Sequence, residues 1–395
     1  MSETREVVVL SGVRTAIGGY GGGLKDQPPS DLAALCVKEA VSRAGIEPSD
    51  VGHVVFGNII HTDPHDHYLA RVACVKGGLP HETPALTLNR LCGSGMQAII
   101  TAANAIMLGD ADAAVAGGAE CMSRSPYLAP AMRWGARMND TTMTDMMVGA
   151  LSDPFDNVHM GVTAENVAKK YNISREDQDK LAVESHRRAG IAVDKGYFKA
   201  QILPVMVKVK GGTVPFELDE GIRRDSSVEK LGRLKPVFDP AGSVTPGNAS
   251  SINDAAAAVV LMERKLAEKK GLQPLGRLVA YSYAGVDPKY MGMGPVPAVK
   301  AVLKRAGLGL NDIDVFEVNE AFAAQALAVC RSLELPSEKT NPNGSDISLG
   351  HPIGATGTIL AIKALYELKR TGARRALATM CIGGGQGIAA IFERM

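Results

Sequence analysis

The chain repeats the order of its predicted elements, and this repeat constrains its fold more than any other feature. Residues 304–320 (KRAGLGLNDIDVFEVNE) echo residues 42–58 (SRAGIEPSDVGHVVFGN), and residues 371–385 echo residues 108–120 in their strand and glycine turn. Any two segments of an α/β protein share some features, but here the order of the elements matches as well. The repeat therefore predicts two similar α/β units packed together.

Within each unit, strands alternate with helices. Helices are predicted over residues 30–44 and 94–108, with Ser30 capping the first helix and Gly45 closing it. Strands of the first unit are predicted at residues 7–10, 53–57, 85–91 and 112–118, and the second unit has a strand at 277–285 and a helix at 297–307. This alternation is typical of a mostly parallel sheet with helices on both faces.

A segment of different character separates the two units. It holds the only tryptophan, Trp134, several methionines and a polar helix predicted at residues 174–190. We expect it to form loops over a pocket and to contribute to a subunit contact. The expected domains are an N-terminal half at residues 1–120, rejoined by residues 251–271, an inserted loop domain at residues 121–250 and a C-terminal half at residues 272–395.

Charge and composition argue against several classes of protein. The net charge is +1, so no global field attracts nucleic acid or an anionic membrane. The N-terminus lacks the basic and apolar regions of a signal peptide, and no unbroken apolar run reaches the roughly 18 residues of a membrane span. Six cysteines without a CxxC pair favour reduced thiols, and therefore a cytoplasmic location, over a disulfide framework or a zinc ribbon.

Cys92 lies in LTLNRLCGSGMQAI, between a predicted strand and a predicted helix. At a helix N-terminus, free backbone N–H groups favour the thiolate, which is the nucleophilic form of cysteine. A cysteine among small residues is also common in protein cores, so this segment alone leaves both roles open. The glycines that follow imitate a dinucleotide-binding fingerprint, but Asp110 and Asp112 precede the next strand instead of ending it. A nicotinamide-dependent oxidoreductase is therefore only weakly indicated.

Three further segments hold groups that could act with Cys92. His351 lies in the glycine-rich SLGHPIGATG, where an imidazole can accept a proton at neutral pH, although a lone loop histidine is more often simply solvated. Cys381 ends a predicted strand and precedes three glycines, whose backbone N–H groups can approach an oxyanion. Asn319, in VNEAFAAQA, falls where a strand passes into a helix and either caps that helix or faces the cleft.

Taken together, NRLCGSG, NEAF, GHPIGATG and CIGGGQG resemble the thiolase family in order and spacing, over essentially the whole chain. SGVRTAIG (11–18) and SPYLAPAMRWGARM (125–138) are similar to the biosynthetic acetyl-CoA acetyltransferases and broad-range bacterial β-ketothiolases of that family. The resemblance implies two βαβαβαββ halves in a layered α/β/α/β/α core with an inserted loop domain. It also implies reversible Claisen condensation of two acyl-CoA molecules to a 3-ketoacyl-CoA and CoA, with ping-pong kinetics through an acyl-cysteine.

The same resemblance implies roles for individual residues. Cys92 is the expected nucleophile, His351 takes its proton, and Cys381 is the second acid/base. One oxyanion hole is implied at His351 together with a water held by Asn319. The other is implied at the backbone N–H groups of Cys92 and Gly383.

Contacts to coenzyme A carry over through matching positions. Ser250 and Ala249 match positions at the pantetheine arm, and Arg223 is a candidate for the nucleotide phosphates. The other expected lining residues are Leu151, His159, Met160, Phe238, Met291, Ala321 and Phe322. Ser251 and Lys230 depart from the family pattern, which affects details of the CoA contact and not the reaction type.

No permanently bound cofactor and no metal are expected; CoA and acyl-CoA are substrates, and a homodimer or homotetramer is implied. His61, His65 and His67 have a spacing that could bind a metal, but a solvated or interface loop is favoured because thiolase chemistry needs none. Two alternatives stay open. They are a degradative 3-ketoacyl-CoA thiolase acting on long chains, and a thiolase-like module that binds acyl-CoA without catalysis.

Overall fold

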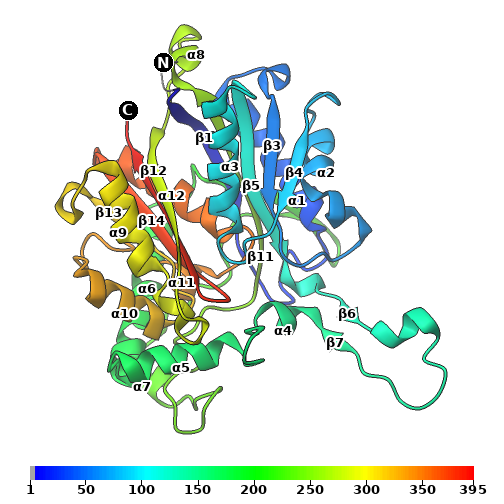
Figure 1. Cartoon of the computed structure of the whole chain (residues 1–395), viewed down its shortest axis with the longest axis vertical. Helices are drawn as coiled ribbons and strands as arrows, with labels where there is room; N and C mark the ends of the chain where they lie inside the picture. Colours follow the sequence, from blue (N-terminus) through cyan, green and yellow to red (C-terminus); the bar gives the residue numbers. More distant parts are fainter. Residues whose placement is uncertain (1–4) are drawn as a thin grey trace.

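One extended sheet runs through the protein and consists of two similarly built parts (Figure 1). The structure is a computed structural model that describes residues 5–395. In the first part the strand order is β1 (Val7–Thr15), β11 (Asn253–Glu263), β5 (Ala113–Cys121), β3 (His53–Gly57) and β4 (Ala85–Leu88). In the second part it is β12 (Gly276–Gly285), β15 (Gln386–Glu393), β14 (Arg375–Ile382) and β13 (Val315–Val318). A short antiparallel pairing of β1 with β12 joins the two parts.

The two parts share one pairing scheme. β1–β11 and β11–β5 are antiparallel, whereas β5–β3 and β3–β4 are parallel. Likewise β12–β15 and β15–β14 are antiparallel and β14–β13 is parallel, with a single parallel bridge from Phe316 to Thr340 in place of a fifth strand. The sheet is therefore mixed, and the prediction of a mostly parallel sheet was wrong. In the second half β14 and β15 follow one another without a crossover helix and pair antiparallel as a hairpin, whereas in the first half the insertion between β5 and β11 returns the chain for an antiparallel pairing.

Helices cover both faces of each part and produce five layers. α1 (Pro29–Ala44) and α2 (Leu69–Lys76) cover the outer face of the first part, and α9 (Pro295–Ala306) and α10 (Ala323–Leu333) that of the second. α3 (Ser94–Leu108) and α12 (Thr356–Thr371) pack against each other between the two parts. This arrangement confirms the duplicated halves and the layered α/β/α/β/α core.

The central layer is held by side chains from both halves. Met96 and Ile99 of α3 lie in one buried cluster with Ile359 and Ile362 of α12. Each such side chain stabilises the fold by about 1.5–3 kcal/mol relative to exposure. In the described part of the chain, residues 91–108 form one segment long and apolar enough to cross a membrane, but more than half of it is buried inside the protein. A helix packed on both sides is expected to be apolar all round, so this segment is a core helix.

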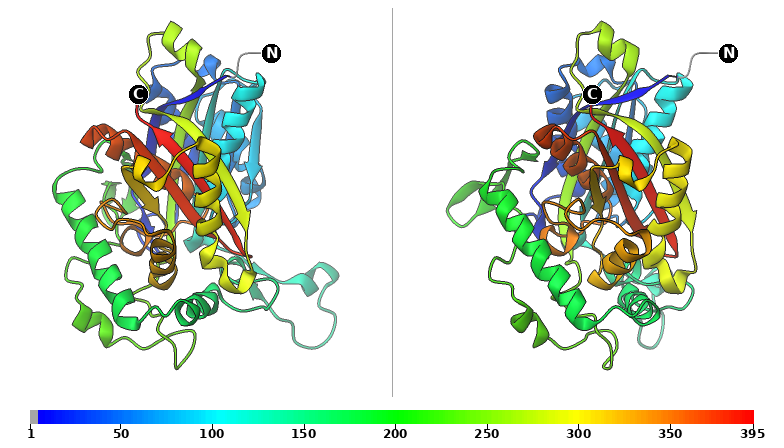
Figure 2. Two further views of the ribbon diagram at one scale, coloured as in Figure 1. Left: turned by 60° about the vertical axis from the view of Figure 1, so that its left-hand side comes forward. Right: turned by 90° about the vertical axis from the view of Figure 1, so that its left-hand side faces the viewer.

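Apart from β8, the chain between β5 and β11 lies outside the main sheet, along one end of the molecule (Figure 2). Its regular elements are α4 (Met146–Ala150), α5 (Met160–Lys170), α6 (Arg175–Asp194), α7 (Val228–Gly232) and the hairpin of β9 (Val205–Val209) and β10 (Gly212–Phe216). Within it, β8 (Ile202–Leu203) pairs with β1, and β2 (Gly18–Gly19) of the first half pairs with β11. After β11, α8 (Arg264–Lys269) leads into the second half, where α11 (Asp346–Leu349) precedes α12.

A hairpin of this insertion projects away from the body of the protein (Figure 1). We call residues 126–145, which include β6 (Tyr127–Leu128) and β7 (Thr144–Asp145), the arm. Its side chains Trp134 and Met138 are 87% and 81% exposed. The arm also exposes Tyr127, Leu128, Met132 and Met143, and a group of exposed apolar side chains is typical of a contact surface.

The ends of the helices agree only partly with the caps predicted from the sequence. α1 begins at Pro29 with Pro28 in the N-cap position and no side-chain cap, so the prediction that Ser30 caps this helix was wrong. Proline suits the first turn because it has no N–H to leave unpaired. Gly45 closes the helix at φ 67°, as predicted, and Ser174 caps α6 by accepting the N–H of Asp177.

Candidate active site

A cavity of about 250 Å³ opens where the two halves meet under the insertion. Its lining combines side chains from both halves with a wall contributed by the insertion. The lining residues are Leu91, Cys92, Met122, Ala150, Leu151, His159, Met160, Val237, Phe238, Thr245, Pro246, Ala249, Ser250, Ser251, Ile252, Met291, Ala321, Phe322, His351, Ile353, Cys381 and Gly383. The structure thus brings together four of the five residues with predicted catalytic roles, and Asn319 lies directly behind them.

Cys92 occupies the turn between β4 and the start of α3. The preceding residue, Leu91, has φ 45°, a conformation that costs a bulky side chain about 1–3 kcal/mol and is found mainly at functional sites. Ser94 fixes the turn, since its hydroxyl donates to the Leu91 carbonyl (2.7 Å) and accepts the Arg90 N–H (2.8 Å).

Burial raises the pKa of the Cys92 thiol to about 11, although the backbone N–H groups of Gly383 and of Cys92 itself act in the opposite direction. The prediction that the helix N-terminus favours a thiolate was therefore wrong. Loss of hydration outweighs the helix effect at this position, because a thiolate needs more solvation than a thiol. Cys92 rests as a thiol and requires a base.

His351 can supply that base. Its backbone N–H donates to Asn253 Oδ1 (2.8 Å), and its Nδ1 lies 2.8 Å from the Thr356 hydroxyl oxygen. Thr356 Oγ1 donates to the Pro352 carbonyl (3.0 Å), so it accepts the Nδ1 proton and leaves Nε2 with a free lone pair. Burial lowers the pKa of His351 to about 4, so the ring is neutral at physiological pH. Nε2 is buried without a partner among the described residues, which leaves it free to take a proton.

Cys381 and Asn319 form a second reactive pair. Asn319 Oδ1 accepts the backbone N–H of Cys381 (3.0 Å), and Asn319 Nδ2 donates to the Cys381 sulfur at 3.6 Å. Burial, together with the nearby Cys92, raises the pKa of the Cys381 thiol above its usual range. A Cβ at Gly383 would lie 2.8 Å from Cε of Met160, so the end of that flexible side chain would have to move aside.

The loop of residues 350–355, which carries His351, lies directly on β5. A Cβ at Gly118 of β5 would lie 2.0 Å from the carbonyl oxygen of Gly354. The buried Glu120 carboxylate accepts the N–H groups of Ile59 (3.1 Å), Ile60 (3.0 Å) and Gly354 (3.0 Å), and burial raises its pKa to about 8. Sequence reasoning missed Glu120, Thr356 and Asn253, because their partners lie far away in the chain or depend on side-chain orientation.

The insertion supplies an apolar and aromatic wall. The His159 ring stacks on Phe238 with centroids 4.6 Å apart, and Phe238 meets Phe322 edge-on at 6.3 Å. The predicted CoA residues Ser250, Ala249, Leu151, His159, Met160, Phe238, Met291, Ala321 and Phe322 all line the cavity. Such a lining suits a flexible, largely apolar chain with few polar contacts.

Arg223 does not line the cavity. It is exposed on the insertion, and its backbone N–H donates to His186 Nδ1 (3.1 Å). Lys230 pairs with Asp225 (2.7 Å), while Ser251 does line the cavity and contacts Asn253 Oδ1 (3.0 Å).

The three-histidine segment has a different arrangement from a metal site. His61 and His67 face each other with 3.1 Å between their Nδ1 atoms, whereas His65 turns to Asp63. Across residues 5–395, no group of three His, Cys, Asp or Glu side chains is arranged to hold a metal ion.

Comparisons with known proteins show which family the chain belongs to. Residues 7–265 match the thiolase N-terminal domain and residues 272–394 match the thiolase C-terminal domain. The chain is 64% identical over 393 residues to the β-ketothiolase BktB of Cupriavidus necator, which covers 99% of this chain and 100% of that relative. The crystal structure of acetyl-CoA acetyltransferase from Bacillus anthracis superposes with a TM-score of 0.98 at 45% identity, over 100% of both chains. Human mitochondrial 3-ketoacyl-CoA thiolase in complex with CoA gives a TM-score of 0.95 at 43% identity, over 99% of this chain and 98% of that one. The chain therefore belongs to the thiolase family.

Proposed function

We propose that this thiolase, an acyltransferase, catalyses the reversible condensation of two acyl-CoA molecules to a 3-ketoacyl-CoA and CoA. The observation that carries the proposal is the meeting of Cys92, His351 and Cys381 in one cavity, with the Gly383 N–H beside the Cys92 sulfur. Two thiols and one neutral imidazole are the groups that two successive proton transfers require.

In the first half-reaction His351 Nε2 accepts the Cys92 proton as the sulfur attacks the thioester carbonyl of an acyl-CoA. The N–H groups of Cys92 and Gly383 stabilise the tetrahedral oxyanion. The carbon–sulfur bond to CoA then breaks, His351 returns the proton to the CoA sulfur, and the acyl group stays on Cys92.

In the second half-reaction Cys381 removes an α-proton from a second acyl-CoA. Its thiol first passes its own proton to His351 Nε2, and the Nδ2 donor of Asn319 supports the resulting thiolate. We assign stabilisation of the enolate oxygen to His351 and to a water held by Asn319. The enolate carbon attacks the acyl-Cys92 carbonyl, the carbon–sulfur bond breaks, His351 returns its proton to the Cys92 sulfur, and 3-ketoacyl-CoA leaves.

Coenzyme A is proposed to enter along the wall of Ser250, Ala249 and Phe238, with its pantetheine arm directed at Cys92. A relative of the same fold is known in complex with CoA, which supports the binding of CoA. The nucleotide then points toward solvent, where the exposed guanidinium of Arg223 is a candidate contact for its phosphates.

Intact-mass measurement after incubation with acetyl-CoA tests the proposal. One acetyl group on the Cys92 peptide is expected, with none in Cys92→Ala. Absence of the adduct, or full activity of Cys92→Ala, would overturn the assignment.

A degradative 3-ketoacyl-CoA thiolase is the second candidate, favoured by the 43% identity to the human mitochondrial enzyme of that name. The catalytic groups would be the same, so only the depth of the acyl pocket separates the two functions. A series of kcat/KM values for substrates of increasing chain length, in both directions, decides between them.

We further propose that the enzyme is a cytoplasmic homo-oligomer, either a dimer or a tetramer. The exposed Trp134 and Met138 of the arm support a subunit contact, because isolated surface loops rarely expose such side chains together. Light scattering should show a mass above that of one chain. Trp134→Ser combined with Met138→Ser should lower it if the arm makes the contact.

A further inference from the structure

Behind the catalytic imidazole lies a carboxyl group that the reaction scheme above does not use. Asp346 begins α11, and its Oδ2 lies 3.5 Å from Nδ1 of His351. The Asp346 side chain is only 5% exposed and does not line the cavity. The imidazole therefore separates this carboxyl from the cavity that holds both thiols.

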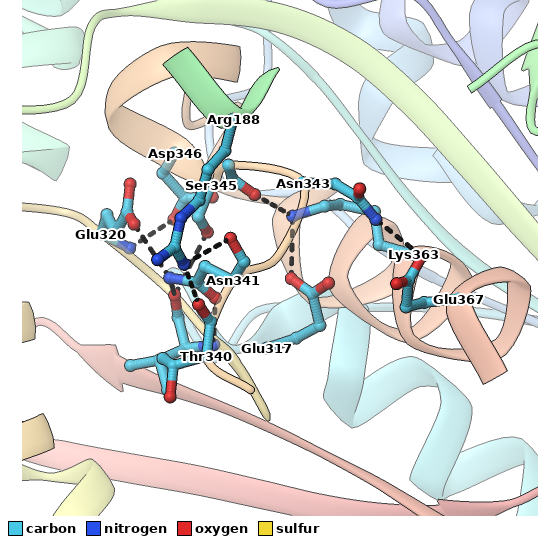
Figure 3. Close-up of polar contacts among 12 residues, drawn as sticks. Arg188, Glu317, Glu320, Thr340, Asn341, Asn343, Ser345, Asp346, Lys363 and Glu367 are labelled. Atoms are coloured by element: carbon cyan, nitrogen blue, oxygen red, sulfur yellow. Dashed lines mark hydrogen bonds and ion pairs between the residues drawn. The ribbon is translucent and has the colours of Figure 1, made fainter. Parts of the chain in front are cut away.

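Asp346 lies in a buried group with two other acids, Glu317 and Glu320 (Figure 3). The buried cation of this group, Lys363, contacts other partners than Asp346. The ammonium of Lys363 pairs with Glu317 (2.8 Å) and donates to the Gly344 carbonyl (2.6 Å). Glu320, on the segment after β13, donates its backbone N–H to Asp346 Oδ2 (3.3 Å). Its carboxylate accepts from Ser185 (2.6 Å) and Asn341 (2.9 Å).

We propose that Asp346 is a positioning residue that, as a carboxylate, holds His351 in place and stabilises the imidazolium formed when His351 takes the Cys92 proton. The inference rests on the proposed role of His351 as the base. In the transfer, the Cys92 S–H bond breaks and an Nε2–H bond forms. The Nδ1 proton stays in place, facing both the Thr356 hydroxyl and the Asp346 carboxylate.

The surroundings of Asp346 make this support depend on pH. Burial raises its pKa well above the usual range, Glu320 and Glu317 act in the same direction, and Lys363 opposes them. Asp346 is therefore a neutral acid at low pH and a carboxylate only above its raised pKa. An ionised Asp346 also raises the pKa values of Cys92 and Cys381. The imidazolium is in direct contact with it, so the net effect favours proton transfer.

Thr356 provides a neutral comparison at the same ring nitrogen. Its hydroxyl orients the imidazole at every pH, because it does not ionise in this range. Loss of Thr356 and loss of Asp346 therefore predict different pH profiles, although both weaken the same base.

Alkylation of Cys92 by iodoacetamide tests the proposal without any CoA chemistry. We would measure the rate on the Cys92 peptide by mass spectrometry from about pH 5 to about pH 10, a range that extends to both sides of the ordinary histidine pKa of about 6.5. In the unmodified protein the alkylation rate should rise with pH over the range in which Asp346 ionises. Asp346→Asn should match it at low pH and fall behind by about 10-fold at high pH, less than the 10²–10⁴-fold effect of a general base because Thr356 remains. Thr356→Val should be slower by a similar factor at every pH.

Two further variants keep the test decisive if Asp346→Asn does not fold. Asp346→Glu retains an ionisable carboxyl and should keep the pH-dependent rise. Glu320→Gln removes a negative neighbour of Asp346 and should move that rise to lower pH. A constant ratio between Asp346→Asn and the unmodified protein at all pH values, or an unmoved profile in Glu320→Gln, would show that Asp346 only fills space. Failure of acetylation with a normal alkylation profile would instead count against the proposed function alone.

Discussion

Gly118→Ala should disable the enzyme without touching any group that reacts. The added Cβ would lie 2.0 Å from the Gly354 carbonyl oxygen, 2.8 Å from its carbonyl carbon and 3.0 Å from Cα of Ala355. These are backbone atoms of the loop that carries His351, so no flexible side chain can move aside. Because close-packed interiors do not tolerate such overlap, the loop must shift by about 1 Å.

A displacement of about 1 Å at a catalytic group can lower a rate by about 10²-fold, and we expect acetyl transfer to Cys92 to slow by that order. The overpacked site should also destabilise the fold by about 1–3 kcal/mol. KM should change little, because the CoA wall lies on the insertion. The assay is rapid-quench acetylation of Cys92 by acetyl-CoA, combined with chemical denaturation.

Gly212→Ala is the matched control. Gly212 also lies in a strand, β10, and a Cβ there would meet nothing within 4 Å. It should acetylate at the rate of the unmodified protein. Normal acetylation by Gly118→Ala would refute the view that β5 fixes the position of His351.

Three other outcomes follow from the site and its scaffold. Cys381→Ala should accumulate acetyl-Cys92 on mixing with acetyl-CoA, which intact-mass measurement would show. It should form acetoacetyl-CoA about 10²–10⁴-fold more slowly in a product assay. Rapid condensation would exclude Cys381 as the base. His351→Gln should alkylate slowly at neutral pH, with a rate that climbs about tenfold per pH unit toward the thiol pKa of about 11; a plateau near neutrality would contradict the buried-thiol state. Asp219→Ala should destabilise the fold by about 3–5 kcal/mol in denaturation experiments, because it leaves the fully buried Arg14 guanidinium without its carboxylate (2.8 Å and 3.0 Å). A change below about 1 kcal/mol would show that water reaches Arg14.

Helices and strands that are bounded by clear turn residues were predictable from the sequence. β3 and α3 have the predicted bounds, since a compact apolar run and a glycine-flanked helix mark them clearly. The reactive cysteines and His351 were found because each lies beside a glycine turn at the end of a regular element. The mixed strand directions were missed, because alternation of helices and strands does not reveal how the last two strands of a half run.

The electrostatics of the site were not predictable in the same way. The position of Cys92 at a helix start suggested a thiolate, whereas burial between the two halves raises the pKa of its thiol and favours the protonated form. Glu120 and Asp346 appear as ordinary acidic residues in the sequence. Their contacts form only where β5, β13 and the His351 loop meet in the folded protein. These segments are too far apart in the sequence for a local pattern to reveal the contacts.

The duplicated halves place their reactive groups at positions that do not correspond. α3 begins at Ser94 and α12 at Thr356, so Cys92, two residues before the first, corresponds to Gly354 before the second. The pairing of β13 with β14 corresponds to that of β3 with β5, which sets Cys381 against Ala119. A symmetric pair of N-terminal halves would hold two nucleophiles and no base, and a pair of C-terminal halves would hold bases and no nucleophile. A chain cut between residues 265 and 272 could therefore regain activity only by complementation between unlike fragments.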